Sequence, residues 1–178
     1  MSNTTIGIIG GGQLGSMLST AAKNLNIKTI IISDDKDAPG QFFADEFIFC
    51  KYDNDIKIEE FCNRVDFITF EFENIPYSAL TKIDSIKKIN PKPSINKIVQ
   101  NRISEKDFLN KNNIRTTSYI PINNENELKS SQDFIPGILK TCTLGYDGKG
   151  QYKINNEEEL DNLKVNFEHH YIFEKLVK

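Results

Sequence analysis

The sequence has few residues of the kinds that build covalent or metal-bound frameworks. Its three cysteines, Cys50, Cys62 and Cys142, are odd in number and form no C-x-x-C pair. This pattern argues against a disulfide framework and a zinc site, so we expect reduced, mostly buried thiols. The two histidines, His169 and His170, have no acid or cysteine at a telling spacing, so we expect neither to be catalytic.

Charge and hydropathy argue against two further classes of protein. The net charge is -3 and no basic stripe is present, which argues against a nucleic-acid surface. No apolar run approaches the roughly 20 residues of a membrane span, and the opening Met-Ser-Asn-Thr-Thr lacks the positive segment of a signal peptide. With 38% hydrophobic and 26% charged residues, the composition is that of a globular protein, which we expect to be soluble and cytoplasmic.

The start of the chain carries the first informative motif. The run T-I-G-I-I at residues 5–9 predicts a buried strand, and Gly10, Gly12 and Gly15 satisfy G-x-G-x-x-G. Apolar residues then recur at helical spacing as far as Leu25. Because the first N–H groups of a helix lack intrahelical partners and its dipole is positive there, this loop favours an anionic ligand.

Two acidic residues make a dinucleotide the first candidate for the ligand of this loop. Asp34 and Asp35 follow a second apolar run about 20 residues past the glycines, where dinucleotide-binding folds carry a ribose-binding acid. A single glycine motif is weak, however. The stretch alone leaves open a dinucleotide, another anionic ligand, or a purely structural strand-to-helix turn.

The rest of the first half alternates strands with helices. The pattern predicts strands at 28–32, 47–49 and 66–70, with Ile58, Phe61 and Cys62 on the inner face of a helix between them. This order predicts right-handed β-α-β units and a mainly parallel sheet, which binds ligands beyond the carboxyl ends of its strands.

The strand expected at 66–70 runs directly into Glu71 and Glu73. If the chain stays extended there, both carboxylates lie on one face, where they can accept hydrogen bonds from ribose hydroxyls or an amine. The alternative is that both acids begin a solvated turn before the helix expected at 77–83. Loops at this edge commonly carry binding sites, so we assign a functional role to at least one of them.

Two prolines within residues 89–94 predict a domain boundary. Beyond it the pattern predicts a helix at 101–112, a strand at 116–119, a helix at 125–130 and a buried strand at 138–140. In the first of these helices, Ile103, Phe108 and Leu109 are expected to face inward. We expect no internal repeat and attribute the asparagine-rich segments to composition bias.

A second glycine loop follows Lys140. Residues 145–151 read G-Y-D-G-K-G-Q and precede another short strand at 152–154, which predicts a glycine-rich hairpin. Three glycines in six positions free successive N–H groups to fold around phosphate oxygens, and Lys140 can neutralise their charge. A purely structural hairpin needs only one glycine.

Taken together, these motifs resemble the amino-terminal half of the N5-carboxyaminoimidazole ribonucleotide synthase family of ATP-grasp carboxylases. The resemblance rests on I-I-G-G-G-Q-L-G, F-E-F-E-N-I-P, N-R-I-S-E-K-D-F-L, L-K-T with G-Y-D-G-K-G-Q, and I-F-E-K-L-V, and it covers essentially the whole chain. It implies an α/β fold in which residues 1–93 form a Rossmann-like pre-ATP-grasp domain with a parallel sheet. Residues 94–178 would begin an incomplete ATP-grasp domain.

The resemblance also implies the roles of individual residues. The substrate-binding residues would be Gly12, Gln13, Leu14, Glu71, Glu73, Tyr146, Asp147 and Lys149. The ATP-binding residues would be Arg102, Lys140, Gly145, Tyr146, Asp147, Gly148, Lys149, Gly150, Gln151, Glu174, Lys175, Leu176 and Val177. The catalytic residues would be Asp147, which would receive a proton from the substrate amine, and Lys140, which would neutralise phosphate charge.

The reaction implied is ATP-dependent formation of carboxyphosphate from bicarbonate, followed by carboxylation of the exocyclic amine of aminoimidazole ribonucleotide. The family's Mg²⁺-binding acids, the rest of its ATP site and its last domain are expected beyond residue 178, so no residue of this chain is assigned to metal. The complete protein is expected to be a homodimer. We expect this chain to be inactive alone, and residues 101–178 to be less stable than residues 1–90.

One departure and two alternative enzymes accompany this interpretation. Leu144 stands where the family usually has another glycine, which predicts a stiffer entrance to the loop. A related ATP-grasp enzyme, such as the formate-dependent glycinamide ribonucleotide transformylase, shares the architecture, although Tyr146 and Asp147 favour the carboxylase. A nicotinamide-dependent oxidoreductase would explain Asp34 but not Lys140 and the second loop. A non-catalytic binding module is the third possibility.

Overall fold

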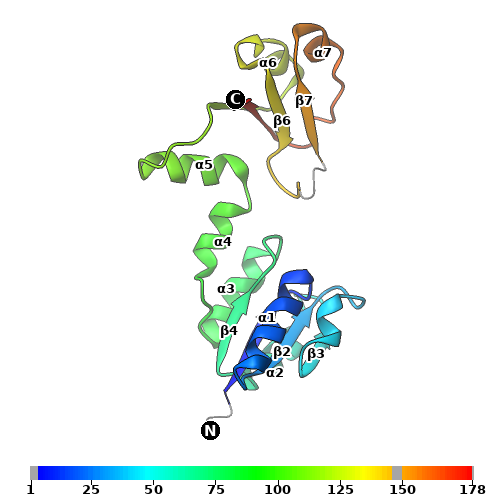
Figure 1. The fold of residues 1–178 in the computed structure, drawn as a ribbon, viewed down its shortest axis with the longest axis vertical. Coiled ribbons are helices and arrows are strands. Elements are labelled where there is room, and N and C mark those ends of the chain that lie inside the picture. Colours follow the sequence, from blue (N-terminus) through cyan, green and yellow to red (C-terminus); the bar gives the residue numbers. More distant parts are fainter. Residues whose placement is uncertain (1–3, 146–149, 178) are drawn as a thin grey trace. The chain divides into compact units, whose positions relative to one another are not determined.

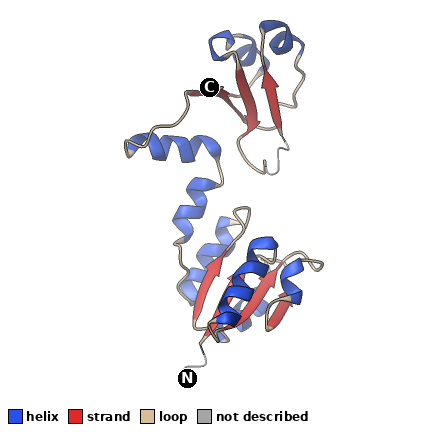
Figure 2. Cartoon of the chain, in the orientation of Figure 1, coloured by secondary structure: helices blue, strands red, loops and turns tan. Residues whose placement is uncertain are grey.

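The computed structural model describes residues 4–145 and 150–177 (Figures 1 and 2). Its contacts divide the chain into two compact units, Met1–Lys97 and Ile98–Lys178. Each unit has its own sheet and its own hydrophobic core. In the part of the chain that the structure describes, no helix combines the length and the apolarity that crossing a bilayer requires.

The first unit is built on a four-stranded parallel sheet. Its elements are β1 (Thr5–Ile9), α1 (Gln13–Asn24), β2 (Lys28–Ser33), the 3-10 helix η1 (Pro39–Phe42), β3 (Glu46–Phe49), α2 (Asp55–Asn63), β4 (Phe67–Phe70), α3 (Tyr77–Ile86) and α4 (Pro93–Val99). The strand order is β3-β2-β1-β4, and all three pairings are parallel. This confirms the predicted α/β fold with a parallel sheet.

Alternate side chains of the strands face opposite layers of helix, as the period of two requires. Ile9, Ile30 and Ile32 pack in one core cluster with the inner faces of α2 and α3. Phe61 of α2 belongs to that core and is fully buried, as predicted together with its neighbours Ile58 and Cys62. The sheet is therefore sandwiched, and its carboxyl-end edge is left for a ligand.

Helix α1 packs by its small residues rather than its large ones. Gly15, Ser16, Ser19 and Ala22 are buried. The larger apolar residues that predicted the helix are 42–70% exposed, and they are Leu14, Met17, Leu18 and Leu25. The helix is confirmed, but its close approach to the sheet buries the small face and leaves the large one on the surface.

The second unit contains an antiparallel sheet. Its elements are α5 (Arg102–Lys111), β5 (Tyr119–Ile122), α6 (Glu125–Lys129), the 3-10 helix η2 (Gln132–Phe134), β6 (Gly137–Thr141), β7 (Gln151–Ile154), α7 (Glu157–Asn162) and β8 (Tyr171–Lys175). The strand order is β5-β8-β6-β7, with antiparallel pairing throughout. The expected strand at 116–119 begins only at Tyr119.

Two further expectations for this unit were wrong. Phe108 was expected to face inward, but its side chain is 47% exposed and α5 has no buried residue, because this helix meets the sheet through charged groups. An internal repeat was not expected either. Residues 122–128 read I-N-N-E-N-E-L and residues 154–160 read I-N-N-E-E-E-L, and each segment ends a strand and starts a helix.

The two copies of this seven-residue repeat have matching hydrogen bonds. In the first, the Asn124 side chain accepts a bond from the Glu127 N–H at 3.0 Å, while Glu127 accepts one from the Asn123 N–H at 2.7 Å. In the second, Asn156 and Glu159 repeat this reciprocal arrangement. The asparagines thus cap α6 and α7, which gives a structural role to residues that composition alone left unexplained.

The sheet of the second unit has two different faces. On one face, Leu139 of β6 and Phe173 of β8 form a core with residues of α6 and α7. On the other face lie Lys140, Glu174 and Tyr119, since the register pairs Tyr119 with Glu174 and side chains alternate along each strand. Charged groups are therefore concentrated on the face away from the apolar core.

Candidate functional site

The first candidate site begins at the glycine turn between β1 and α1. Gly10 has φ +102°, a conformation that residues with a side chain rarely adopt, and its N–H donates to the Ile32 carbonyl at 2.9 Å. A Cβ on Gly15 would lie 2.8 Å from the Gly10 carbonyl oxygen. Glycine at these two positions lets the chain turn sharply and lets α1 start close against the strand end.

Glu71 comes to the same turn from the end of β4. Its N–H donates to the Ile9 carbonyl at 3.1 Å, and its Oε1 accepts a hydrogen bond from the Gly12 N–H at 2.8 Å. Burial raises the pKa of Glu71, and the bond from Gly12 lowers it in part. A carboxylate of the protein itself therefore occupies the helix start where a dinucleotide-binding fold places pyrophosphate.

A pocket of about 360 Å³ opens beside this carboxylate. Its lining includes Gly12, Gln13, Leu14 and Glu71, which are four of the predicted substrate-binding residues. Glu73, the other predicted acid, is exposed and is not part of this lining. The geometry thus brings Glu71, rather than both acids, to the glycine turn.

The same pocket contains Tyr52, which sequence reasoning did not single out, and Asp34, which it considered as a ribose-binding acid. Tyr52 lines it, and its hydroxyl is buried close to Ser33 and Asp34. Burial, with the nearby charge of Asp34, raises the pKa of Tyr52. Asp34 lines the pocket as well. A tyrosine that comes just after the third strand is the signal that could have identified this position.

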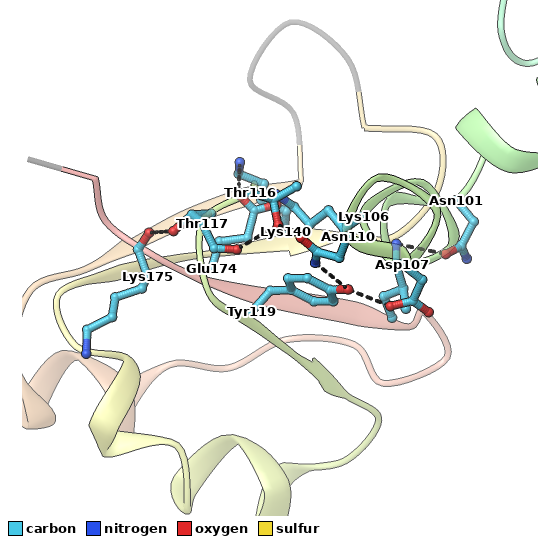
Figure 3. A network of polar contacts seen from close by, with 11 residues as sticks. Asn101, Lys106, Asp107, Asn110, Thr116, Thr117, Tyr119, Lys140, Glu174 and Lys175 are labelled. Atoms are coloured by element: carbon cyan, nitrogen blue, oxygen red, sulfur yellow. Dashed lines mark hydrogen bonds and ion pairs between the residues drawn. The ribbon is translucent and has the colours of Figure 1, made fainter. Parts of the chain in front are cut away.

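The second candidate site lies on the charged face of the other sheet (Figure 3). Lys140 Nζ lies 2.8 Å from Glu174 Oε2, and Lys106 Nζ lies 3.4 Å from Glu174 Oε1. Glu174 is only 7% exposed, so its carboxylate is nearly enclosed between two ammonium groups. Lys140 and Glu174 were predicted from the resemblance, whereas Lys106 was not.

Helix α5 brings Arg102 to this region as well as Lys106. The Asn101 side chain caps its start by accepting bonds from the N–H groups of Ile103 and Ser104. Arg102 is anchored twice, since its backbone N–H donates to the Cys142 carbonyl and its Nη2 donates to the Gly145 carbonyl at 2.8 Å. Lys106 follows Arg102 by one turn and shares its face, which is the spacing by which it could have been predicted.

The second glycine loop starts and ends on paired strands. Lys140 pairs with Gln151 in the β6–β7 register, and the Thr141 N–H donates to the Gly150 carbonyl at 2.9 Å. Leu144 has φ +58°. That is a left-handed conformation typical of glycine, which a residue with a side chain adopts at a cost. The predicted residues Tyr146, Asp147, Gly148 and Lys149 lie outside the described residues.

The predicted adenine segment continues from β8. The Lys175 N–H donates to the Ser118 carbonyl and the Leu176 N–H to the Pro136 carbonyl, both at 2.9 Å. Val177 is 74% exposed. These bonds fix the course of residues 174–177 along the edge of the charged face.

No metal centre can be built from the residues that the structure describes. Within residues 4–145 and 150–177, no three acidic, histidine or cysteine side chains gather around one point. All three cysteines are buried and free.

Comparison with known proteins gives the family. The model of the ribonucleotide synthetase preATP-grasp domain matches residues 3–100, and that of the ATP-grasp domain matches residues 107–178. The chain belongs to the ribonucleotide synthetase preATP-grasp family. In this family context, the first unit corresponds to the preATP-grasp match and the second unit to a partial ATP-grasp match.

The relatives agree on one enzyme. The N5-carboxyaminoimidazole ribonucleotide synthase of Brucella melitensis is 39% identical over 158 residues, which are 88% of this chain and 44% of that protein. The ADP complex of the Staphylococcus aureus synthetase superposes with a TM-score of 0.84 at 30% identity, covering 98% of this chain and 48% of that one. A complex from Aspergillus clavatus with ADP and 5-aminoimidazole ribonucleotide gives 0.79 at 25% identity, covering 99% and 47%.

This chain of the preATP-grasp family thus spans about half the length of the curated relatives it matches. The resemblance found from the motifs is confirmed, and so is the predicted order of a Rossmann-like unit followed by part of an ATP-grasp unit.

Proposed function

We propose that this chain supplies the ribonucleotide-binding domain and the first part of the ATP site of an N5-carboxyaminoimidazole ribonucleotide synthase. The observation that carries this proposal is the bond between Gly12 and Glu71. A carboxylate at the helix start repels the pyrophosphate of a dinucleotide but can accept a bond from an amine or a hydroxyl. This favours an aminoimidazole ribonucleotide in the first unit and leaves the nucleoside triphosphate to the cations of the second.

The proposed reaction has two steps. A bicarbonate oxygen attacks the γ-phosphorus of ATP, the bond to ADP breaks, and carboxyphosphate forms. The exocyclic amine of the ribonucleotide then attacks the carboxyl carbon, phosphate leaves, and the amine loses a proton to Asp147. Arg102 and Lys140 would neutralise the phosphate charge that develops in the first step.

The assignment of ranges and residues is part of the same proposal. Residues 1–93 would form the pre-ATP-grasp domain and residues 94–178 the start of the ATP-grasp domain. Gln13 and Leu14 would line the ribonucleotide site with Glu71, while Glu73 is kept as a second acid at its rim. The strand end at Glu174, with the three residues after it, would hold adenine.

The second glycine loop would close over the triphosphate. Its predicted residues run from Gly145 to Gln151, and Tyr146, Asp147 and Lys149 would also face the ribonucleotide. A closed loop excludes water, which a labile acyl phosphate requires. Mg²⁺ would accompany ATP without a ligand from this chain. The complete enzyme would be a homodimer, as the resemblance implies, and cytoplasmic, as the composition predicts.

Titration separates this function from its alternatives. We expect the chain to bind 5-aminoimidazole ribonucleotide, with the heat signal lost in Glu71→Ala, and not to bind NADH. NADH binding without ribonucleotide binding would contradict the proposal and favour an oxidoreductase.

Because the chain matches less than half of the length of its relatives, we expect no ATP- and bicarbonate-dependent carboxylation by it alone. Measurable turnover would overturn that expectation, and formate use in place of bicarbonate would favour the transformylase.

A further inference from the structure

Glu174 is a carboxylate that the fold encloses and neutralises from two sides. The side chains of Lys106 and Lys140 are only 16% and 18% exposed, and each approaches a different oxygen of Glu174. An enclosed carboxylate is costly to keep ionised unless a cation or hydrogen-bond donors stay beside it. One lysine would be enough to balance the Glu174 carboxylate. With two, the group formed by Lys106, Lys140 and Glu174 carries one net positive charge.

The two lysines are held differently. Lys140 lies on β6, before the second glycine loop, and Glu174 lies diagonally from it on β8. Lys106 lies on α5, and its ammonium group is 5.7 Å from the centre of the Tyr119 ring. That ring is itself fixed, because the Tyr119 hydroxyl donates to Asp107 (Figure 3). Lys106 therefore has a second support that is independent of Glu174.

We propose that Lys106 is a positioning residue of the nucleotide site, which holds the Glu174 carboxylate in place while Lys140 turns to a phosphate oxygen. The proposal rests on the proposed function, since it needs a nucleotide on this face. After the exchange, Lys106 pairs with Glu174 and Lys140 pairs with the phosphate, so no enclosed charge is left alone. Without Lys106, a move of Lys140 to the phosphate would leave the enclosed Glu174 carboxylate without a cation. Lys140 would therefore stay paired with Glu174.

The test compares nucleotide and nucleoside binding to the whole chain. Heteronuclear NMR titration with ATP–Mg²⁺ and with adenosine gives a dissociation constant for each, even where binding is weak. We expect Lys106→Met to weaken ATP binding by about 10- to 100-fold and to change adenosine binding by less than about threefold. Lys106→Arg should restore most of the ATP affinity, because a guanidinium can hold the same carboxylate.

The control is Lys111→Met, which removes an exposed lysine from the last turn of the same helix and should leave both affinities unchanged. Equal loss of ATP and adenosine binding in Lys106→Met, with a lower melting temperature, would show a merely structural role and overturn the inference. So would unchanged ATP binding. If the unsubstituted chain binds neither ligand, the proposed nucleotide site itself fails, which is a different result from either of these.

Discussion

The Glu71 carboxylate accepts a hydrogen bond from the Gly12 N–H across 59 positions of sequence. This bond joins the end of β4 to the first turn of α1, which are neighbours because parallel strands end at one edge of the sheet. The helix start attracts the negative charge, while burial opposes it. Glu71 therefore places a carboxyl group of the protein at the wall of the pocket.

The pH dependence of stability tests this environment. The folded-state pKa of Glu71 is raised above its ordinary value of 4.5, so the folded state binds the proton more tightly than the unfolded state. The contribution of this group to stability is then full below pH 4.5 and is lost as pH rises through the raised pKa. Glu71→Gln keeps an acceptor for Gly12 and removes the titration, so its advantage over the unsubstituted chain should grow from pH 4.5 upward.

Urea unfolding of the first unit at a series of pH values measures this difference. Glu73→Gln is the control, because it removes an exposed carboxylate from the same segment. An advantage of Glu71→Gln that is the same at every pH would show that burial does not disfavour the charged carboxylate.

Leu144 provides a test of backbone strain. Its φ of +58° costs a residue with a side chain about 1–2 kcal/mol, and glycine would avoid that cost while losing about 0.5–1 kcal/mol through unfolded-chain entropy. Since the Leu144 side chain is 66% exposed, little burial is lost. We expect Leu144→Gly to stabilise the second unit by up to about 1 kcal/mol in thermal unfolding.

Asn113→Gly is the matched comparison, because Asn113 has φ +62° and asparagine tolerates this region better than leucine. Its gain should be smaller. A destabilisation by Leu144→Gly larger than about 1 kcal/mol would mean that the leucine side chain makes a contact worth more than the strain.

The cysteines report the stability of each unit separately. Burial raises the pKa of both Cys62 and Cys142 to about 11, so we expect both to react slowly with iodoacetamide in the folded chain. In increasing urea, Cys142 should become reactive before Cys62, because the core cluster of the second unit is smaller among the described residues. Mass spectrometry of the alkylated peptides gives both curves, and coincident curves would show one cooperative unit.

The paired asparagine caps predict additive effects. Asn124→Ala and Asn156→Ala each remove the acceptor for an N–H at a helix start, which should cost about 1 kcal/mol of unfolding free energy. The caps belong to different helices, so the double variant should lose the sum. Asn162→Ala, at the exposed end of α7, is the control. A double variant no less stable than either single one would show that the helices fray independently of unfolding.

Much of the first unit could be predicted because its strands are nearly continuous isoleucine runs. Ile30, Ile31 and Ile32 indicate a strand that is buried on both faces. The glycines from Gly10 onward mark the end of the neighbouring strand β1. Which face of α1 packs against the sheet was harder to predict from the sequence. Both its small and its large residues recur at helical spacing, and only the close approach permitted by Gly15 decides which stripe is buried.

The candidate sites divide in the same way. The second glycine loop pointed to Lys140, and the family resemblance implied Glu174. Lys106 and Tyr52 carry no local signal of that kind. Their roles follow from tertiary contacts, with a helix laid across a sheet face in one case and a pocket wall in the other. The helical spacing of Lys106 from Arg102 and the place of Tyr52 just after β3 do not by themselves reveal those contacts.

The repeated strand-to-helix segments at 122–128 and 154–160 bear on how folding starts. In each segment, the backbone N–H groups at the helix start are hydrogen-bonded to side chains only a few residues away. Each segment can therefore form before β5 pairs with β8 or β6 pairs with β7. Local contacts of this kind close with little loss of chain entropy. We expect alanine at Asn124 or Asn156 to slow refolding more than it speeds unfolding, which stopped-flow kinetics would detect. In that case the second unit has two equivalent starting points for folding.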